Sequence, residues 1–181
     1  MAFLPFKPQS RAIFSYFVPM HYVTVAQLLI LLSLANGSPV IAKRILGEAY
    51  ATPIDGNIRF VDGRPLLGPS KTVRGVVVSL LVTGVIAPLM GLQIEIGLLV
   101  AVTAMAGDLL SSFFKRRFGF ASSSKATGLD QIPEALFPLL ACRSALSLTS
   151  IDIVAGCVIF FIGELLLSNL FFRLRLRDRP Y

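Results

Sequence analysis

Long apolar runs are the feature of this sequence that most restricts its fold. Leu, Val, Ile and Phe dominate windows that reach or approach the roughly 20 residues a helix needs to cross a hydrocarbon core about 30 Å thick. Hydrophobic residues make up 55% of the 181 positions and charged residues only 15%. This composition is too apolar for a water-soluble domain of this size. We therefore predict an integral membrane protein.

The apolar windows predict an all-α bundle of about five transmembrane helices in a single domain, residues 1–181. Helices are expected because backbone groups inside lipid must be satisfied internally, and the windows lack the strict alternation of a β-barrel. The second and third windows are separated by only a short turn and should form an antiparallel hairpin. The predicted spans cover about 22–46, 76–94, 96–114, 132–149 and 153–172.

Two polar segments, 47–75 and 115–131, connect these spans and should lie on the same side as the C-terminus. All Lys and Arg residues other than Lys7, Arg11 and Arg143 fall on that side. The positive-inside rule makes it the cytoplasmic side of the cell membrane, so the N-terminus is expected outside. The basic C-terminal segment, FFRLRLRDRPY, is predicted to anchor the last span at lipid headgroups.

Several residues carry no functional prediction. The net charge of +7 does not indicate nucleic acid, because the basic residues border apolar spans and are not interleaved with exposed aromatics. Cys142 and Cys157 lie inside apolar runs without metal or disulfide spacing, so both are interpreted as small hydrophobes. His21 is expected at the outer interface, away from any chemistry.

The first motif that carries chemistry is the loop 62–75, DGRPLLGPSKTVRG, which leads into the second span. Gly68 allows close approach of the backbone, and the hydroxyls of Ser70 and Thr72 can bind a ligand or cap a helix. Lys71 and Arg74 stand one turn apart at a helix N-terminus, which favours phosphate. An ordinary basic flank with an N-cap is an equally good interpretation. The order of residues is not that of a nucleotide P-loop.

The second motif is the end of the third span, where Asp108, Ser111, Ser112 and Lys115 share one helical face. A carboxylate inside an apolar helix costs about 2.5–3.5 kcal/mol at mid-bilayer on insertion scales, so it usually faces a cavity or a partner and marks function. The alternative is a structural Asp108 paired with Lys115 or with a neighbouring helix.

The third motif begins the fourth span, at Asp130 and Gln131. Asp130 could simply cap that helix. It is expected on the same side of the membrane as Asp108, however, and two carboxylates that converge on nucleotide phosphates can hold a hard cation such as Mg²⁺. The pair therefore predicts a Mg²⁺ site.

The first span carries polar residues in its middle. Asn36, Pro39 and Lys43 follow helical spacing, and Pro39 removes a backbone hydrogen bond, which fits a kinked helix that lines a polar cleft. A plain structural kink explains the same residues. The other polar residues inside predicted spans, Arg143, Glu164 and Asn169, are interpreted as contacts between helices.

At these motifs the chain resembles the CDP-archaeol synthase family, archaeal relatives of the phosphatidate cytidylyltransferases. The resemblance rests on ANGSPV at 35–40, on the loop 62–75, and on residues 107–117 together with Asp130-Gln131. It departs from the family pattern at Val73, where an aromatic residue is usual. It departs again at 122–124, where three serines replace a Gly-rich stretch.

The resemblance implies an enzyme that transfers CMP from CTP to 2,3-bis-(geranylgeranyl)-glycerol 1-phosphate, giving CDP-archaeol and pyrophosphate with Mg²⁺ as the cofactor. Catalysis would consist of positioning and charge neutralisation, because a lipid phosphate is already a nucleophile at neutral pH. The predicted catalytic residues are Lys71, Arg74, Asp108, Lys115, Arg116 and Asp130, with Asp108 and Asp130 on the metal. The predicted substrate-binding residues are Asn36, Lys43, Arg64, Gly68, Ser70, Thr72, Ser111, Arg117 and Gln131.

Two alternatives remain at this point. One is a cytidylyltransferase that acts on phosphatidic acid, although the short chain favours an isoprenoid lipid. The other is a small transporter or channel subunit, in which the polar face would line a permeation path. Such a path should carry polar residues through the whole bilayer depth, whereas the outer halves of the second, third and fifth spans are almost wholly apolar. The sequence leaves the oligomeric state open.

Overall fold

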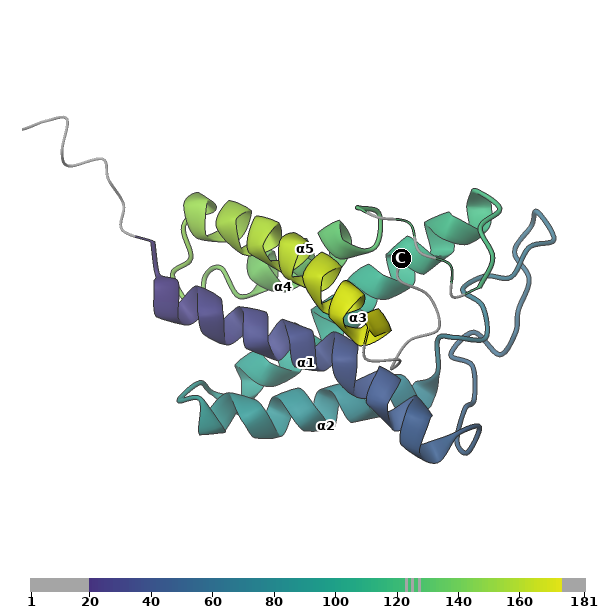
Figure 1. Ribbon diagram of the computed structural model, residues 1–181, viewed down its shortest axis with the longest axis horizontal. Coiled ribbons are helices and arrows are strands. Elements are labelled where there is room, and N and C mark those ends of the chain that lie inside the picture. Colours follow the sequence, from purple (N-terminus) through teal and green to yellow (C-terminus); the bar gives the residue numbers. More distant parts are fainter. Residues whose placement is uncertain (1–19, 123, 125, 127, 174–181) are drawn as a thin grey trace, which may run out of the picture.

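The computed structural model describes residues 20–122, 124, 126 and 128–173, and this part of the chain is built from helices (Figure 1). Beyond the helices, the described residues contribute two isolated β-bridges, Pro53 with Thr72 and Arg59 with Pro65, and no regular strand. The all-helical prediction is therefore confirmed. The helices are α1 (Tyr22–Leu46), α2 (Val73–Leu89), α3 (Ile94–Arg117), α4 (Gln131–Ala141) and α5 (Ser150–Arg173).

The helix α1 has the predicted bounds, and the ends of α2, α3 and α5 differ from the predicted ones by one to five residues. The helices α1 and α3 are long and apolar enough to cross a membrane, and α2 is a shorter apolar helix of 17 residues. The helix α2 begins at Val73, three residues before the predicted start, because Thr72 caps it by accepting a hydrogen bond from the Gly75 amide at 3.2 Å. The helix α3 continues through the basic residues to Arg117.

The predicted fourth span, 132–149, is wrong as a continuous helix. Its helix α4 ends at Ala141, and its 11 residues extend about 16 Å, roughly half of a hydrocarbon core. The segment after it is rich in Ser and Thr, whose side chains compete for backbone groups, and Ser147 takes a positive φ of 53°. Hydrophobicity averaged over a window does not register these helix-ending residues.

The start of α5 is fixed by a local signal in the sequence. Thr149 and Asp152 form a capping box: the Thr149 amide donates to the Asp152 carboxylate at 2.8 Å, and the Asp152 amide donates to the Thr149 hydroxyl at 3.1 Å. This pair starts the helix at Ser150 instead of the predicted Ile153.

Contacts between helix ends define the direction of each helix. The Gln27 side chain near the start of α1 donates to the Met90 carbonyl after α2 at 2.7 Å, and Arg74 at the start of α2 donates to the Gly47 carbonyl after α1 at 2.9 Å. His21 before α1 lies 2.8 Å from Asp152 in α5. Hence α1 and α5 run in one direction and α2 in the other, with the loop 47–72 at one end of the molecule (Figure 1).

The start of α4 packs against α3 well before that helix ends. A Cβ atom placed on Gly107 of α3 would lie 2.4 Å from the Pro133 carbonyl oxygen, so the first turn of α4 packs directly against the backbone of α3. Gly97 makes a similar approach to the Thr83 carbonyl of α2. Such close contacts at glycine are typical of helices that associate within lipid.

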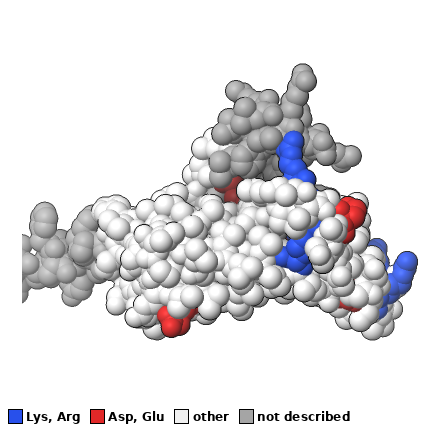
Figure 2. Space-filling model, turned by 90° about the horizontal axis from the view of Figure 1, so that it is seen from below, with Lys and Arg blue, Asp and Glu red and all other residues white. Residues whose placement is uncertain are grey.

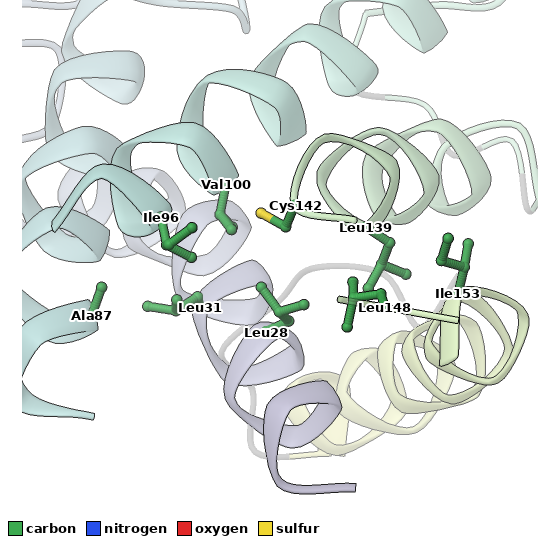
Figure 3. Packing of buried hydrophobic residues seen from close by; sticks show 9 residues of the cluster. All are labelled: Leu28, Leu31, Ala87, Ile96, Val100, Leu139, Cys142, Leu148 and Ile153. Atoms are coloured by element: carbon green, nitrogen blue, oxygen red, sulfur yellow. The ribbon is translucent and has the colours of Figure 1, made fainter. Parts of the chain in front are cut away.

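The apolar core lies away from the long loops. Its largest cluster brings together side chains from all five helices and the segment after α4 (Figure 3). Cys142 is fully buried beside Val100, which confirms its interpretation as a small hydrophobe. The cluster consists of Leu28, Leu31, Ala87, Ile96, Val100, Leu139, Cys142, Leu148 and Ile153.

Some predictions concern residues outside the described part of the chain. These are the outer-side residues Lys7 and Arg11, the loop residue Lys125, the basic anchor at 174–181 and the side chain of Asn169.

Candidate active site

A polar cavity of about 420 Å³ lies at the loop end of the bundle. In Figure 2 the Lys and Arg side chains gather toward that end, while the remainder of the visible face is largely uncharged. The cavity is bounded by α1, the loop before α2, the start of α2, and parts of α3, α4 and α5. The predicted site residues that line it are Asn36, Lys43, Ser70, Lys71, Thr72, Arg74, Asp108, Lys115, Arg116, Asp130 and Gln131.

The loop that delivers Ser70, Lys71 and Thr72 is organised by Asp55, which the sequence analysis did not single out. The Asp55 carboxylate is buried and accepts hydrogen bonds from the Asn57, Leu67 and Gly68 amides at 3.0, 2.8 and 3.1 Å. Burial alone would raise the pKa of Asp55, but the bonds from the backbone amides stabilise the carboxylate and hold its pKa below the ordinary value. An acidic residue that precedes Gly and Asn is the signal that could have identified this turn.

Two ion pairs face the cavity. Lys71 donates to both carboxylate oxygens of Asp108, at 2.6 and 2.5 Å, and Lys115 lies 2.8 Å from the Asp130 carboxylate. In the first pair both side chains are about one-fifth exposed, and in the second both are more deeply buried. The structure thus pairs Asp108 with the loop before α2, and not with Lys115 on its own helix.

A further carboxylate, Glu134, was missed from the sequence. It is 7% exposed, lines the cavity from α4, and accepts a hydrogen bond from the Asn36 side-chain amide at 3.1 Å. The signal was present, because Glu134 is a charged residue in the first turn of a predicted span. Glu164 of α5 and Ser112 of α3 also line the cavity, so Glu164 is placed in the site and not only between helices.

Arg74 and Arg116 line the cavity but also hold the backbone around it. Arg74 is 8% exposed and donates to the Gly47 and Ala49 carbonyls at 2.9 and 2.5 Å, which fixes the end of α1 to the start of α2. Arg116 donates to the Phe120 carbonyl at 2.5 Å and closes the turn that follows α3.

Four predicted substrate-binding residues do not line the cavity. Ser111 is fully buried and its hydroxyl donates to the Asp108 carbonyl at 2.9 Å, so it stabilises its own helix. Gly68 is buried in the turn made by Asp55 and has a φ of +102°, a conformation that glycine adopts without strain. At both positions the contacts that the structure describes are structural.

Arg64 and Arg117 are the other two, and both attach the loop to the end of α3. Arg117 lies 2.8 Å from Asp62 and donates to the Pro65 carbonyl at 2.5 Å, with its guanidinium over the Phe60 and Phe113 rings. The Arg64 side chain donates back to the Arg116 and Arg117 carbonyls. Sequence alone could not distinguish these two arginines from the arginines that line the cavity.

The charged side chains of the cavity suit two kinds of ligand, phosphates and a hard cation. Its cations suit the phosphates of a nucleotide or a lipid. Its carboxylates suit a hard cation, because Mg²⁺ commonly binds one or two carboxylates together with substrate phosphates. Within the described part of the chain, no three His, Cys, Asp or Glu residues are grouped so as to hold a metal by themselves.

Comparison with known proteins gives a consistent result. A family model described as CarS-like, CDP-archaeol synthase, matches residues 90–181. The chain is 36% identical over 169 residues to a CDP-archaeol synthase of Sulfurisphaera tokodaii, a match that covers 90% of this chain and 98% of the relative. A CDP-archaeol synthase of Sulfolobus acidocaldarius is 31% identical over 153 residues, which is 81% of this chain and 90% of the relative.

A solved structure is also similar. It is described as an intramembrane enzyme for archaeal membrane lipids biosynthesis. The two chains superpose with a TM-score of 0.64 and 26% sequence identity, over 77% of this chain and 91% of the other. The match therefore covers most of the fold described above.

Proposed function

The chain belongs to the CDP-archaeol synthase family, and we propose on this basis that it transfers CMP from CTP to an isoprenoid glycerol phosphate lipid. The products are CDP-archaeol and pyrophosphate. The observation that supports this chemistry best is that two ion pairs face one cavity in an apolar bundle. These are Lys71 with Asp108 and Lys115 with Asp130. Family membership favours this transferase over the transporter alternative.

In the proposed reaction an oxygen of the lipid phosphate attacks the α-phosphorus of CTP. The new phosphorus–oxygen bond forms, the bond from the α-phosphorus to the β-phosphate oxygen breaks, and pyrophosphate leaves. No general base is required, because the lipid phosphate is anionic at neutral pH. The chain accordingly has a single histidine, His21, which is paired with Asp152 at the far end of the bundle. The task of the protein is to orient two anions and neutralise their charge.

Different cavity residues would serve the charge neutralisation and the orientation. Lys71, Lys115 and Arg116 supply positive charge to the phosphates, and each is held by a carboxylate or a carbonyl before any substrate arrives. A side chain that is already oriented gives up less freedom when the phosphate binds. Ser70 and Thr72 present hydroxyls from the loop that carries Lys71.

Mg²⁺ is part of the proposal, and Asp108 and Asp130 are the residues that would hold it. Both line the same cavity, and the phosphates of CTP would complete the coordination. When bound, the ion neutralises charge on the triphosphate and on the leaving pyrophosphate.

For the membrane we propose five crossings, with the cavity open to the cytoplasm. The sidedness follows from the positive-inside rule, since the basic residues lie at the cavity end. Single cysteines in a cysteine-free background test it with an impermeant thiol reagent on intact cells. Glu95→Cys should be labelled from outside and Asp62→Cys only after permeabilisation; labelling of Asp62→Cys on intact cells would reverse the orientation.

The activity is tested by pyrophosphate release from purified protein given CTP and either an isoprenoid glycerol phosphate or phosphatidic acid. We expect release with the isoprenoid lipid and slower release with phosphatidic acid. Faster turnover of phosphatidic acid would favour the alternative lipid, and no release with either lipid would contradict the proposed function.

A further inference from the structure

A hairpin in the loop before α2, residues 58–66, brings apolar side chains to the surface at the loop end of the bundle (Figure 1). Backbone hydrogen bonds join its two arms, among them one from the Phe60 amide to the Arg64 carbonyl at 2.8 Å. Gly63 permits the tight turn between the arms with a φ of +74°. Val61 lies at this turn and is 95% exposed. The hairpin therefore presents an aliphatic side chain that the described part of the chain leaves uncovered.

Aromatic contacts join this hairpin to the end of α3. The Phe60 ring packs edge-on against Phe113, with the ring centroids 5.3 Å apart, and Phe113 packs in the same way against Phe114 at 5.8 Å. Phe118 follows Phe114 by one helical turn. Phe60 and Phe114 are each about two-fifths exposed, and Phe118 is about two-thirds exposed. We call this surface the apolar rim; its members are Phe60, Val61, Phe114 and Phe118.

The length of α3 places the apolar rim at the boundary between lipid and water. The charged Glu95 in the first turn of α3 marks the outer edge of the hydrocarbon core. Phe113 lies 18 positions later in the same helix, which is about 27 Å along the axis, whereas the core is about 30 Å thick. A tilted helix covers less depth, so Phe113 and the Phe60 ring beside it lie no further out than this boundary. Phe118 lies just beyond it, at the level of the headgroups.

Basic side chains accompany the apolar rim. The Arg117 guanidinium lies 4.8 Å from the centroid of the Phe60 ring and is paired with Asp62 at 2.8 Å. Arg59 is exposed on the hairpin, and its side chain donates to the Gly63 carbonyl at 2.9 Å, a contact with a neutral group that leaves its positive charge in place. Aromatic rings beside arginines are typical of protein surfaces at the headgroup layer, where the rings enter the apolar boundary and the cations attract anionic lipids.

We propose that the hairpin 58–66 is a membrane anchor, in which the apolar rim enters the headgroup layer beside the cavity and Arg59 binds anionic headgroups. The partner is the lipid surface, because the rim lies at headgroup depth and carries cations beside its rings. The anchor adds to the proposed reaction a second attachment to the membrane, for the loop that brings Ser70, Lys71 and Thr72 to the cavity. It depends on the proposed membrane crossings and not on which lipid reacts.

The sequence contains no Trp, so one introduced Trp reports on its own surroundings. Val61→Trp places it on the apolar rim, and Val85→Trp, at an exposed position in the interior of α2, is the lipid-facing control. Each variant is placed in nanodiscs of phosphatidylcholine and phosphatidylglycerol, which leave both membrane faces open to water. Two quenchers are compared, phosphatidylcholine brominated on the chain carbons near the headgroup and aqueous acrylamide. Free N-acetyltryptophanamide gives the acrylamide quenching of a fully exposed ring.

We expect the brominated lipid to quench Val61→Trp as strongly as Val85→Trp, and acrylamide to quench Val61→Trp several-fold less than the free amide. Lipid quenching of Val61→Trp that is several-fold weaker than that of Val85→Trp would overturn the proposal. The acrylamide result then shows whether water or another protein surface covers the rim. Neither readout requires turnover, so a failure of the anchor is distinguishable from a failure of the proposed reaction.

The composition of the nanodisc tests the role of charge. Lipid quenching of Val61→Trp should increase with the fraction of phosphatidylglycerol, and added salt should reverse the increase by screening the attraction. Adding Arg59→Gln to this variant should reduce the increase, whereas Arg143→Gln, which changes an exposed arginine in the segment after α4, should leave it unchanged. No response to phosphatidylglycerol, or the same response with either arginine replaced, would contradict the binding of anionic headgroups by Arg59.

Discussion

Lys71 and Asp108, 37 positions apart in the sequence, form a two-point contact in which one ammonium donates to both carboxylate oxygens, at 2.6 and 2.5 Å. The contact joins the loop before α2 to the polar face of α3 at the wall of the cavity. It gives the Asp108 carboxylate a partner within an apolar bundle, where an unpaired charge would be expensive. The pair also holds a cation and an anion ready for phosphate and metal.

Asp108→Asn should fold but lose pyrophosphate release by about two to three orders of magnitude, because it removes the charge proposed to hold the metal beside the bound phosphates. Asp62→Asn is the matched control, since Asp62 also pairs with a cation, Arg117, but lies outside the cavity. The control should keep near-normal activity. Specific activity and thermal stability are measured on the same preparation, and a stable, fully active Asp108→Asn protein would exclude Asp108 from the catalytic machinery.

Removal of divalent cations should abolish turnover, and added Mg²⁺ should restore it, because two carboxylates line a cavity suited to a triphosphate. CTP should be preferred over ATP and GTP. Pyrophosphate release is followed with excess chelator and then after Mg²⁺ is returned. Full turnover in the chelator, or equal rates with ATP, would be incompatible with the proposed reaction.

Gly107→Ala should destabilise the protein by about 1–3 kcal/mol, because the new methyl group would lie 2.4 Å from the Pro133 carbonyl oxygen and push α4 away from α3. Gly163→Ala in α5 is the control, since a Cβ there meets nothing within 4 Å. It should be neutral or slightly stabilising, as alanine favours a helix over glycine. Thermal unfolding in detergent compares the two variants. Equal stabilities would show that α4 can move away from α3 without a loss of stability.

Asp152→Ala should lower the free energy of unfolding by about 2–4 kcal/mol. The buried carboxylate accepts hydrogen bonds from His21 and Thr149, and its removal would leave those donors without an acceptor. The folded fraction should keep its activity, since this cluster lies at the end of the bundle remote from the cavity. Glu95→Ala, an exposed acidic residue near the same end, should change neither property. A loss of activity in fully folded Asp152→Ala would contradict the separation of the two ends.

Asp55 should make the stability of the loop 47–72 depend on pH. Its pKa is lower in the folded protein than its ordinary value of 3.8, so the carboxylate stabilises the fold above that value and ceases to do so as the pH falls through the folded pKa. Asp55→Asn should therefore increase hydrogen exchange of the Leu67 and Gly68 amides at neutral pH. The difference from wild type should shrink below pH 3.8, and a difference that is constant with pH would rule out the carboxylate as its cause.

The sequence was sufficient for the features that depend on local or averaged properties. The apolar windows predicted the helices, because burial in lipid or in a core requires continuous hydrophobicity. Thr72 capped α2 as expected, because a cap needs only the next three residues. The polar face of α3 was visible because helical spacing places Asp108, Ser112 and Lys115 on one side, and the structure puts all three at the cavity.

Only the tertiary structure decided which polar side chains meet. Lys71 with Asp108, Glu134 with Asn36, and Arg117 with Asp62 are pairs between distant segments, and an arginine on a basic loop has the same sequence signature whether it lines a cavity or attaches a loop. Partner choice depends on how helices pack, which in α3 and α4 is set by backbone contact at Gly107. The sequence determines the kinds of groups near one end of the bundle, and packing determines which of them face the same space.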